Sequence, residues 1–359
     1  MTFLIFHPDF KEYDFGEAHP FRGERVEIFK KIINEKFSDF KILKPKPASD
    51  KDLLLICKKD YIEFTKNYFS AKAKGEDFNG RFFKYHSADN LPSFGCGEIE
   101  KAARLIVGGI KLAIEIATST QQTVITFGGL HHAKPSFGEG FCIYNDVAFG
   151  GKYLLEKKKF ERVLILDTDA HAGNGTCEYF WKEKRVLFID LHQDPKTLYP
   201  GTGFAEEIGE GEGKGFTINV PLPPLASDSS YKLVFEEIIL PVVEKFKPQI
   251  ILRNGGSDPH FADELTNLGL TIKGFYFIGK KVKEIKEKLN IPAIDILGSG
   301  YNLKVLPYAW SALIEGLTGK KSEIKEPIPL PQYLKKDPAF SETKKLVKKI
   351  KNIFKGTWF

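Results

Sequence analysis

Short apolar runs recur along the chain and alternate with stretches of helical periodicity. Each run is rich in β-branched or aromatic residues and shows no alternation with polar positions, which is typical of strands buried on both faces. The runs cover residues 123–127, 162–167, 186–191, 249–253 and 274–278. Helical patterns lie between them, for example over 98–118 and 231–245. The sequence therefore predicts an α/β fold in which helices flank a central, mostly parallel β-sheet.

Polar and glycine-rich segments directly follow four of the predicted strands, the fourth over 292–297. They read GGLHHAKPSFGEGF from Gly128, TDAHAGNGT from Thr168, NGGSDPHF from Asn254 and GSGYN from Gly298. In parallel α/β sheets, active sites form at the carboxyl ends of the strands. We therefore expect the active site at this edge of the sheet.

Composition, net charge and cysteine spacing exclude several classes of protein. The chain has 359 residues, of which 42% are hydrophobic and 28% charged, as expected for a folded protein with a large core. A net charge of +6 is too small to favour nucleic acid as a direct partner. The four cysteines form no CxxC pair, which argues against a disulfide framework or a thiolate zinc finger.

The N-terminal segment and the composition also indicate where the protein is located and what kind of organism it comes from. The start MTFLIFHPDF has no cationic region, and no apolar run approaches about 20 residues, so we expect a cytoplasmic protein without a membrane span. The single methionine and the many lysines and glutamates favour a thermophile source. The sequence leaves the oligomeric state open.

The domain organisation predicted is one catalytic domain over 1–320 and a C-terminal extension over 321–359. Within the extension, 341–355 carries apolar residues at helical spacing with lysines between them. Such a helix could bind acidic lipid, but a terminal helix that packs on its own domain is the more common case, and we favour it.

The segment DTDAH predicts a metal site. In an extended segment, Asp167, Asp169 and His171 project to one side. Two carboxylates and an imidazole beyond a buried strand are costly unless a cation lies among them. Asp258, in NGGSDPH, would be a third ligand beside Asp169 and His171. Three mixed nitrogen and oxygen ligands with an open position are typical of catalytic Zn²⁺, although Fe²⁺ or manganese is compatible.

Four other sequence features bear on the chemistry. His131 and His132 are candidates for general acid–base groups, or one of them is a buried structural histidine. Tyr301 could donate to a carbonyl oxygen as charge develops on it, although loop tyrosines more often pack. His260 is either a fourth ligand or, as we favour, a histidine that supports the metal ligands from outside or packs in the core. GEGEGKGF (209–216) is a surface loop rather than a phosphate loop, because no Ser or Thr follows its lysine.

These motifs resemble the zinc-dependent histone deacetylase family, in its bacterial and archaeal deacetylase-like and acetoin-utilisation branch. The matching segments are GGLHHA, GEGFCIYNDVA, LDTDAHAGNGT, YPGTG, GGSDPH and GSGYN, in the family's order. The likeness runs from His19 to Asn302 and is highly specific. It implies the single-domain arginase/deacetylase fold, with a tunnel leading to one zinc ion.

The resemblance also implies roles for individual residues. Asp169, His171 and Asp258 would bind Zn²⁺, and Tyr301 would polarise the acyl carbonyl. His131 and His132 would be the catalytic histidine pair, with Asp167 orienting one of them and bordering a structural K⁺. The further residues implied are Gly140, Phe141, Tyr199, Leu265 and Asp89 for substrate binding, and Asn174, Arg25 and Asp190 as support around the site.

Two departures from the family pattern bear on these roles. Asp190 stands where a serine is common at the potassium site. Leu265 stands where polyamine-preferring members carry an acidic residue, which argues mildly against a dicationic substrate.

The function expected is hydrolysis of an N-acetyl amide, in an acetylated protein or a small acetylated amine. A polyamine or other small-molecule amidohydrolase would use the same apparatus, and a non-catalytic acyl-ligand-binding protein is the alternative of another class. A binuclear manganese ureohydrolase is disfavoured, because Gly173 and His260 stand where it would need two more aspartates.

Overall fold

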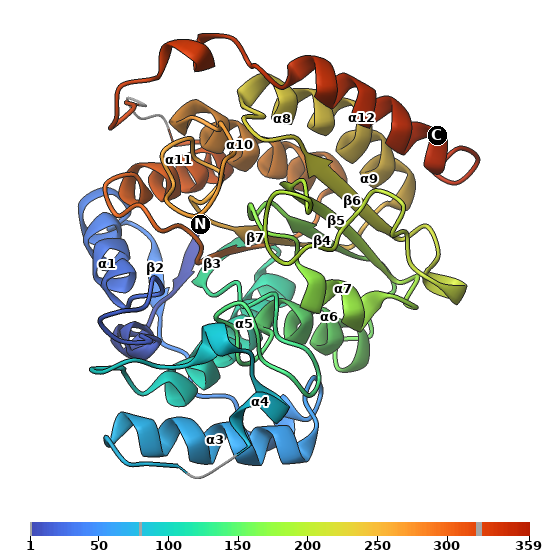
Figure 1. Cartoon of the computed structure of the whole chain (residues 1–359). Coiled ribbons are helices and arrows are strands. Elements are labelled where there is room, and N and C mark those ends of the chain that lie inside the picture. Colours follow the sequence, from blue (N-terminus) through green and yellow to red (C-terminus); the bar gives the residue numbers. More distant parts are fainter. Residues whose placement is uncertain (1, 79–80, 321–324) are drawn as a thin grey trace. The chain divides into compact units, whose positions relative to one another are not determined.

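The computed structural model describes residues 2–78, 81–320 and 325–359 (Figure 1). The chain divides into two compact units, Met1–Lys159 and Phe160–Phe359. Each is an α/β unit, and every strand pairing described within either unit is parallel. The predicted α/β class with a parallel sheet is therefore confirmed.

The first unit contains three parallel strands in the order β2-β1-β3. Its strands are β1 (Phe3–Ile5), β2 (Lys41–Leu43) and β3 (Thr123–Phe127). Its helices are η1 (Pro8–Glu12), α1 (Glu24–Lys36), α2 (Asp50–Leu53), α3 (Lys59–Ala73), α4 (Phe82–Tyr85), η2 (Ala88–Asn90), α5 (Ile99–Thr120) and α6 (Asp146–Glu156). The sequence predicted β3 but not the first two strands, because three residues are too short to show a periodicity.

The second unit contains five parallel strands in the order β8-β7-β4-β5-β6. The strands are β4 (Val163–Asp167), β5 (Val186–Gln193), β6 (Thr217–Leu222), β7 (Ile250–Gly255) and β8 (Ala293–Leu297). Its helices are α7 (Asn174–Phe180), η3 (Gly211–Gly213), α8 (Asp228–Val234), the π-helical η4 (Phe235–Ile239), α9 (Leu240–Phe246), α10 (Ile272–Leu289), α11 (Leu306–Thr318), η5 (Gln332–Lys335) and α12 (Phe340–Ile353). In Figure 1, α8–α12 lie on one side of these strands and α7 lies on the other.

The strand predicted over 274–278 is wrong, because these residues belong to α10. Phe275 and Ile278 are buried, whereas Tyr276 and Phe277 are only half-buried. The buried positions continue at Val282 with helical spacing. The run GFYFI looked continuously apolar because aromatic residues also cover the flanks of this helix.

The C-terminal segment, of which residues 325–359 are described, packs on the rest of the second unit. Its helix α12 contacts α8, η4 and β6, and buries Val347 and Ile350. On its other side, lysines form ion pairs, for example Lys349 with Glu206 at 2.6 Å. The predicted extension starts at residue 321, and residues 321–324 lie outside the described part of the chain.

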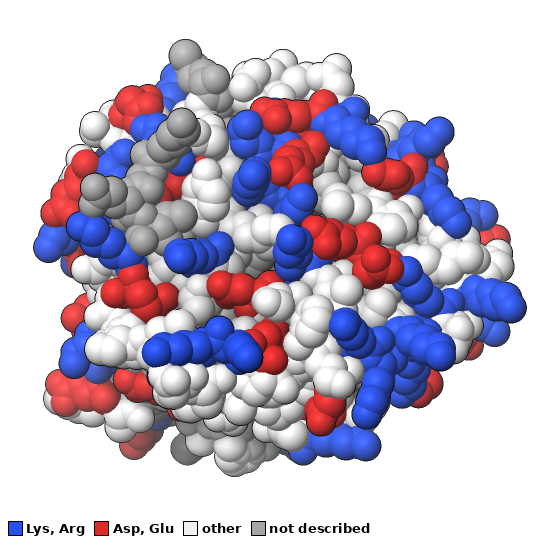
Figure 2. Space-filling view, turned by 90° about the horizontal axis from the view of Figure 1, so that it is seen from above, with Lys and Arg blue, Asp and Glu red and all other residues white. Residues whose placement is uncertain are grey.

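The surface carries mixed charge. Figure 2 shows basic and acidic side chains interspersed with uncharged ones over the face in view. Across the described ranges, no helix combines the length and the apolar character that a bilayer-crossing segment requires.

Candidate active site

The three predicted metal ligands come together in the second unit. Asp169 and His171 follow β4 and Asp258 follows β7, and these strands are direct neighbours. One ligand atom from each residue lies within 4.8 Å of the others. The Nδ1 atom of His171 is 3.1 Å from Asp169 Oδ1 and 3.1 Å from Asp258 Oδ2. All three side chains are buried.

The electrostatics of this cluster fit a divalent cation. Burial, together with the charge of Asp169, raises the pKa of Asp258 above its usual value. Burial alone would lower the pKa of His171, but its hydrogen bonds to the two carboxylates outweigh this and raise the pKa to about 10. The cluster thus concentrates negative charge in a desolvated place, which a cation would relieve. Two carboxylates and one imidazole are also a donor set suited to zinc or iron(II).

The loop after β8 supports the ligand Asp258. Ser299 Oγ donates to Asp258 Oδ1 at 2.6 Å, and Ser257 N donates to Ser299 O at 2.9 Å. Gly256 lies so close that a Cβ there would overlap the carbonyl of Ser299. Ser299 lies in the segment GSGYN, but its role was not predicted. The only sequence signal for it is a hydroxyl residue between two glycines at a strand end.

Tyr301 lies next to the metal-ligand cluster. Its ring centroid is 6.5 Å from that of His171, and the two ring planes are at 84°. The backbone N–H of Tyr301 donates to Asp263 Oδ2 at 2.8 Å. Gly300 before it has a φ of +121°, and a Cβ there would overlap Ser257. The glycine is therefore needed to bring Tyr301 to this place.

His260 is a core histidine in the structure, as favoured from the sequence. Its Nδ1 accepts a hydrogen bond from Ala262 N at 3.1 Å, so the proton of the neutral ring is on Nε2. That Nε2 lies 2.7 Å from Glu326 Oε1. Both ring nitrogens are thus engaged by protein atoms, which leaves neither to bind a metal.

Asp167 and Asp190 occupy neighbouring strands in direct register. The Asp167 carboxylate accepts from Asn254 Nδ2 at 3.0 Å and from Asp169 N at 3.1 Å. Asp190 Oδ1 lies 3.0 Å from His192 Nδ1, and Asp190 Oδ2 accepts from Gly173 N.

His192, for which no role was predicted, lies buried with its Nδ1 3.0 Å from Asp190 Oδ1. Its Nε2 donates to the carbonyl of Gly203 at 2.9 Å. Burial opposes the charged ring, but Asp190 outweighs it and raises the pKa of His192. The imidazole of His192 therefore faces the Asp190 carboxylate directly.

The remaining predicted residues of the second unit lie at its surface or at a helix start. Tyr199 is 42% exposed and Leu265 is 37% exposed, so both are accessible to a substrate. Leu265 N donates to Asp263 Oδ1, the other oxygen of the carboxylate that holds Tyr301. Asn174 is the first residue of α7.

The histidine pair belongs to the first unit and follows β3. The rings of His131 and His132 have centroids 4.2 Å apart, and both side chains are buried. Asn145 Nδ2 donates to the carbonyls of His131 and Ala133, each at 3.0 Å. This amide fixes the backbone of the pair.

Asp146 holds the residues just before the pair. It accepts from the N–H groups of Gly129 at 2.9 Å and Leu130 at 2.6 Å. Burial raises the pKa of Asp146 to about 6. Asn145 and Asp146 lie in the segment CIYNDVA. The structure shows that their side chains bind the backbone of residues 129–133.

Gly140 and Phe141 form a left-handed turn against His132. Their φ angles are +59° and +64°, and a Cβ on Gly140 would overlap the His132 ring. Gly140 N donates to Asp89 Oδ2 at 3.0 Å, and Phe141 O accepts from Tyr13 Oη at 2.7 Å.

Arg25, also of the first unit, is buried. Its guanidinium lies 3.5 Å from the centre of the Phe21 ring, and its Nε donates to Arg22 O. The family resemblance implies that Arg25 supports the surroundings of the site, and this role stays a prediction.

Comparisons with known proteins agree with this picture. The family model described as "Histone deacetylase domain" matches residues 19–317. The chain is 35% identical to a "Probable deacetylase" of Archaeoglobus fulgidus over 370 residues, covering 100% of this chain and 99% of that protein. It is 34% identical to the "Acetoin utilization protein AcuC" of Staphylococcus xylosus, covering 89% of this chain and 83% of that protein.

A solved structure shares the fold. The crystal structure of the HDA15 HD domain superposes with a TM-score of 0.83 at 22% identity, covering 99% of this chain and 95% of that one. The fold is therefore the α/β arginase/deacetylase fold, as predicted. The chain belongs to the histone deacetylase family, in its AcuC-like branch. It is a metal-dependent amidohydrolase.

Proposed function

We propose that this enzyme is a zinc-dependent deacetylase that hydrolyses N-acetyl amides such as acetyl-lysine in proteins. The observation that carries the proposal is the buried cluster of Asp169, His171 and Asp258 with Tyr301 beside it. This donor set leaves room for a substrate oxygen, as in catalytic rather than structural zinc sites. The chemistry that a bound Zn²⁺ supplies is polarisation of the acyl carbonyl and a lowered pKa of the attacking water.

The protein's own residues do the rest of the work in this proposal. Tyr301 donates its phenolic hydrogen to the acyl oxygen as negative charge develops there. The histidine pair, His131 and His132, takes the proton of the attacking water and returns a proton to the leaving amine. The bonds from Asn145 keep the pair's backbone fixed, so little reorganisation is needed during the reaction.

Substrate binding is assigned to apolar and backbone-engaging groups. Phe141 and Tyr199 would flank the acyl-lysine side chain, and Asp89 would contact its backbone near the rim. Leu265 offers no negative charge to a substrate ammonium group, which supports an acetyl-lysine side chain, uncharged once acetylated, over an acetylated polyamine. The K⁺ that the family implies would lie beside Asp167.

A substrate panel with purified enzyme tests the proposal. Zinc-loaded and iron(II)-loaded enzyme should hydrolyse an acetyl-lysine peptide faster than an acetylpolyamine or a small acetylated amine. Asp258→Ala should abolish turnover, whereas Asp77→Ala, at a fully exposed carboxylate, should leave it unchanged.

The other outcomes separate the alternatives. Faster turnover of the acetylpolyamine would replace the protein substrate by a small-molecule one. Zinc binding without turnover of any acyl amine would contradict the enzyme and support an acyl-ligand-binding protein.

A further inference from the structure

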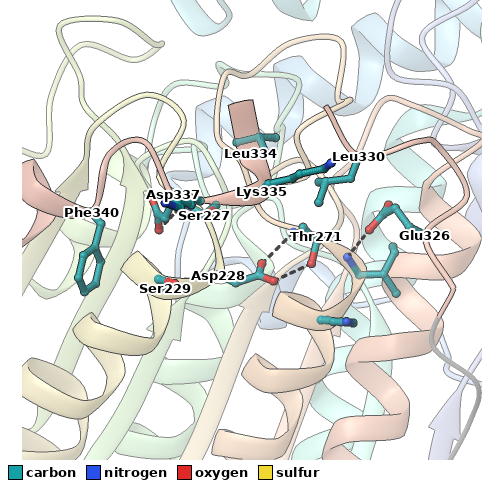
Figure 3. A pocket seen from close by; sticks show the side chains of 13 residues that line it. Ser227, Asp228, Ser229, Thr271, Glu326, Leu330, Leu334, Lys335, Asp337 and Phe340 are labelled. Carbon is teal, nitrogen blue, oxygen red and sulfur yellow. Dashed lines mark hydrogen bonds between the residues drawn. The ribbon is translucent and has the colours of Figure 1, made fainter. Parts of the chain in front are cut away.

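Glu326 of the C-terminal segment joins two parts of the second unit. Its Oε1 accepts from His260 Nε2 at 2.7 Å, and its Oε2 accepts from Ile272 N at 3.1 Å, where α10 begins. Figure 3 shows Glu326 reaching down to the start of that helix. Each carboxylate oxygen thus satisfies one donor.

His260 connects Glu326 to the loop that carries the metal ligand Asp258. The ring is fully buried, and its Nδ1 accepts from Ala262 N within the same loop. Its backbone N–H donates to Ser257 O at 3.1 Å. The imidazole therefore braces loop 256–263 from within through its Nδ1, and Glu326 fixes its Nε2.

The two ends of this loop face the active site. Asp258 lies two residues before His260, and Asp263 lies three residues after it. Asp258 is within 3.1 Å of His171, and Asp263 accepts from the backbone N–H of Tyr301. A rotation of the His260 ring would therefore displace both the metal ligand and the carboxylate that holds Tyr301.

The C-terminal segment has a second, separate attachment. Asp337 accepts from Ser230 N at 2.7 Å and from Ser227 N at 3.2 Å, at the start of α8. A cavity of about 580 Å³ is lined by Glu326, Asp337 and Leu330 among others (Figure 3). The two carboxylates make the same kind of contact, but only Glu326 contacts the loop of the metal ligand.

We propose that Glu326 is a positioning residue of the metal centre and acts through His260. The proposal rests on the proposed function in taking Asp258 as a metal ligand. Polar groups that orient metal ligands from outside commonly contribute about 10–100-fold to metal affinity. Because Glu326 acts through His260 and the loop, we expect Glu326→Ala to weaken Zn²⁺ binding by about 10-fold, at the lower end of that range.

A double-mutant cycle on zinc affinity tests this. The dissociation constant for Zn²⁺ is measured by competition with a chromophoric chelator in the full chain, its Glu326→Ala, His260→Ala and double variants, and Asp337→Ala. If Glu326 acts through His260, the double variant should bind Zn²⁺ no more weakly than His260→Ala alone. Asp337→Ala should lower the melting temperature but leave zinc affinity unchanged.

Two results would overturn the proposal. One is full zinc affinity in Glu326→Ala, and the other is equal loss of affinity in Asp337→Ala, which would make the effect one of general stability. If Glu326→Ala does not fold, Glu326→Gln replaces it. Its amide oxygen can accept from only one of the two donors, so it should still weaken binding, and unchanged affinity there would also reject the role.

The zinc cycle and the substrate panel fail independently. A wild-type chain that binds Zn²⁺ but hydrolyses no acyl amine removes the proposed function, while the affinities still decide the role of Glu326. If the enzyme is active, kcat should fall in Glu326→Ala at saturating Zn²⁺, because the carboxylate that holds Tyr301 is displaced.

Discussion

Breaking the buried ion pair between Arg253 and Asp295 should strongly destabilise the second unit. These residues are direct partners across β7 and β8, and their side chains are 0% and 2% exposed. Arg253 Nε donates to Asp295 Oδ2 at 3.2 Å, and a second bond joins Nη2 to Oδ1. The substitution Asp295→Asn keeps the shape of the side chain and removes its charge.

The expected loss follows from desolvation. Removing one partner leaves a guanidinium buried without its counter-charge, which costs about 3–5 kcal/mol of unfolding free energy. Replacing both partners by apolar residues, Arg253→Met with Asp295→Leu, should cost far less, because no buried charge remains. Glu206→Gln is the control, since its pair with Lys349 is exposed and worth about 0–1 kcal/mol.

Urea unfolding followed by tryptophan fluorescence measures this directly. The chain's three tryptophans, Trp181, Trp310 and Trp358, all lie in the second unit, so the signal reports that unit alone. A loss below about 1 kcal/mol in Asp295→Asn, or a double variant less stable than the single one, would refute the reasoning.

Three further predictions concern the site and the first unit. Tyr301→Phe should lower kcat by about 10²–10³ with little change in KM, because the phenol acts on charge that develops only during the reaction. Ser299→Ala should weaken Zn²⁺ binding about 10-fold, because the hydroxyl orients Asp258, and chelator competition measures it. His86 is buried and desolvation lowers its pKa to about 3, so the unfolded chain binds the extra proton below about pH 6.5. Its contribution is a loss of stability as pH falls from 6.5 toward 3, about 3 kcal/mol by pH 4, and His86→Phe should remove this part of the pH dependence in thermal unfolding.

Each of these has an outcome that contradicts it. Undiminished kcat in Tyr301→Phe would remove the phenol from the mechanism. For Ser299, the matched control is Ser311→Ala, at a buried serine on α11 whose hydroxyl donates to Pro307 O, and equal effects of the two substitutions would reject a specific role for Ser299. For His86, equal acid sensitivity of the wild type and His86→Phe would place the proton uptake elsewhere.

Local pattern was sufficient to place the candidate metal ligands at neighbouring strand ends. Asp169 and His171 follow a buried strand at alternating positions, and parallel strands align their carboxyl ends, so Asp258 could be expected beside them. The fold confirms the strands on which this rested. The strand predicted over 274–278 failed because five residues are too few to distinguish a buried strand from one stretch of an amphipathic helix.

Long-range partners were beyond the sequence. Glu326 and His260 are 66 positions apart, and Arg253 and Asp295 are 42 apart, so no periodicity links either pair. Ser299 lies 41 positions from Asp258. Such contacts are set by the order of strands in the sheet and by the path of the C-terminal segment, which only the tertiary structure defines.

The close approach of Gly256 to Ser299 has a consequence for how this enzyme can evolve. No space lies between the backbones of Gly256 and Ser299. A larger residue at position 256 would therefore push apart the two segments that carry Asp258 and Tyr301. New substrate preferences are therefore expected to arise by replacement of accessible side chains such as Tyr199 and Leu265. The catalytic residues would then stay constant while the exposed side chains around the site vary.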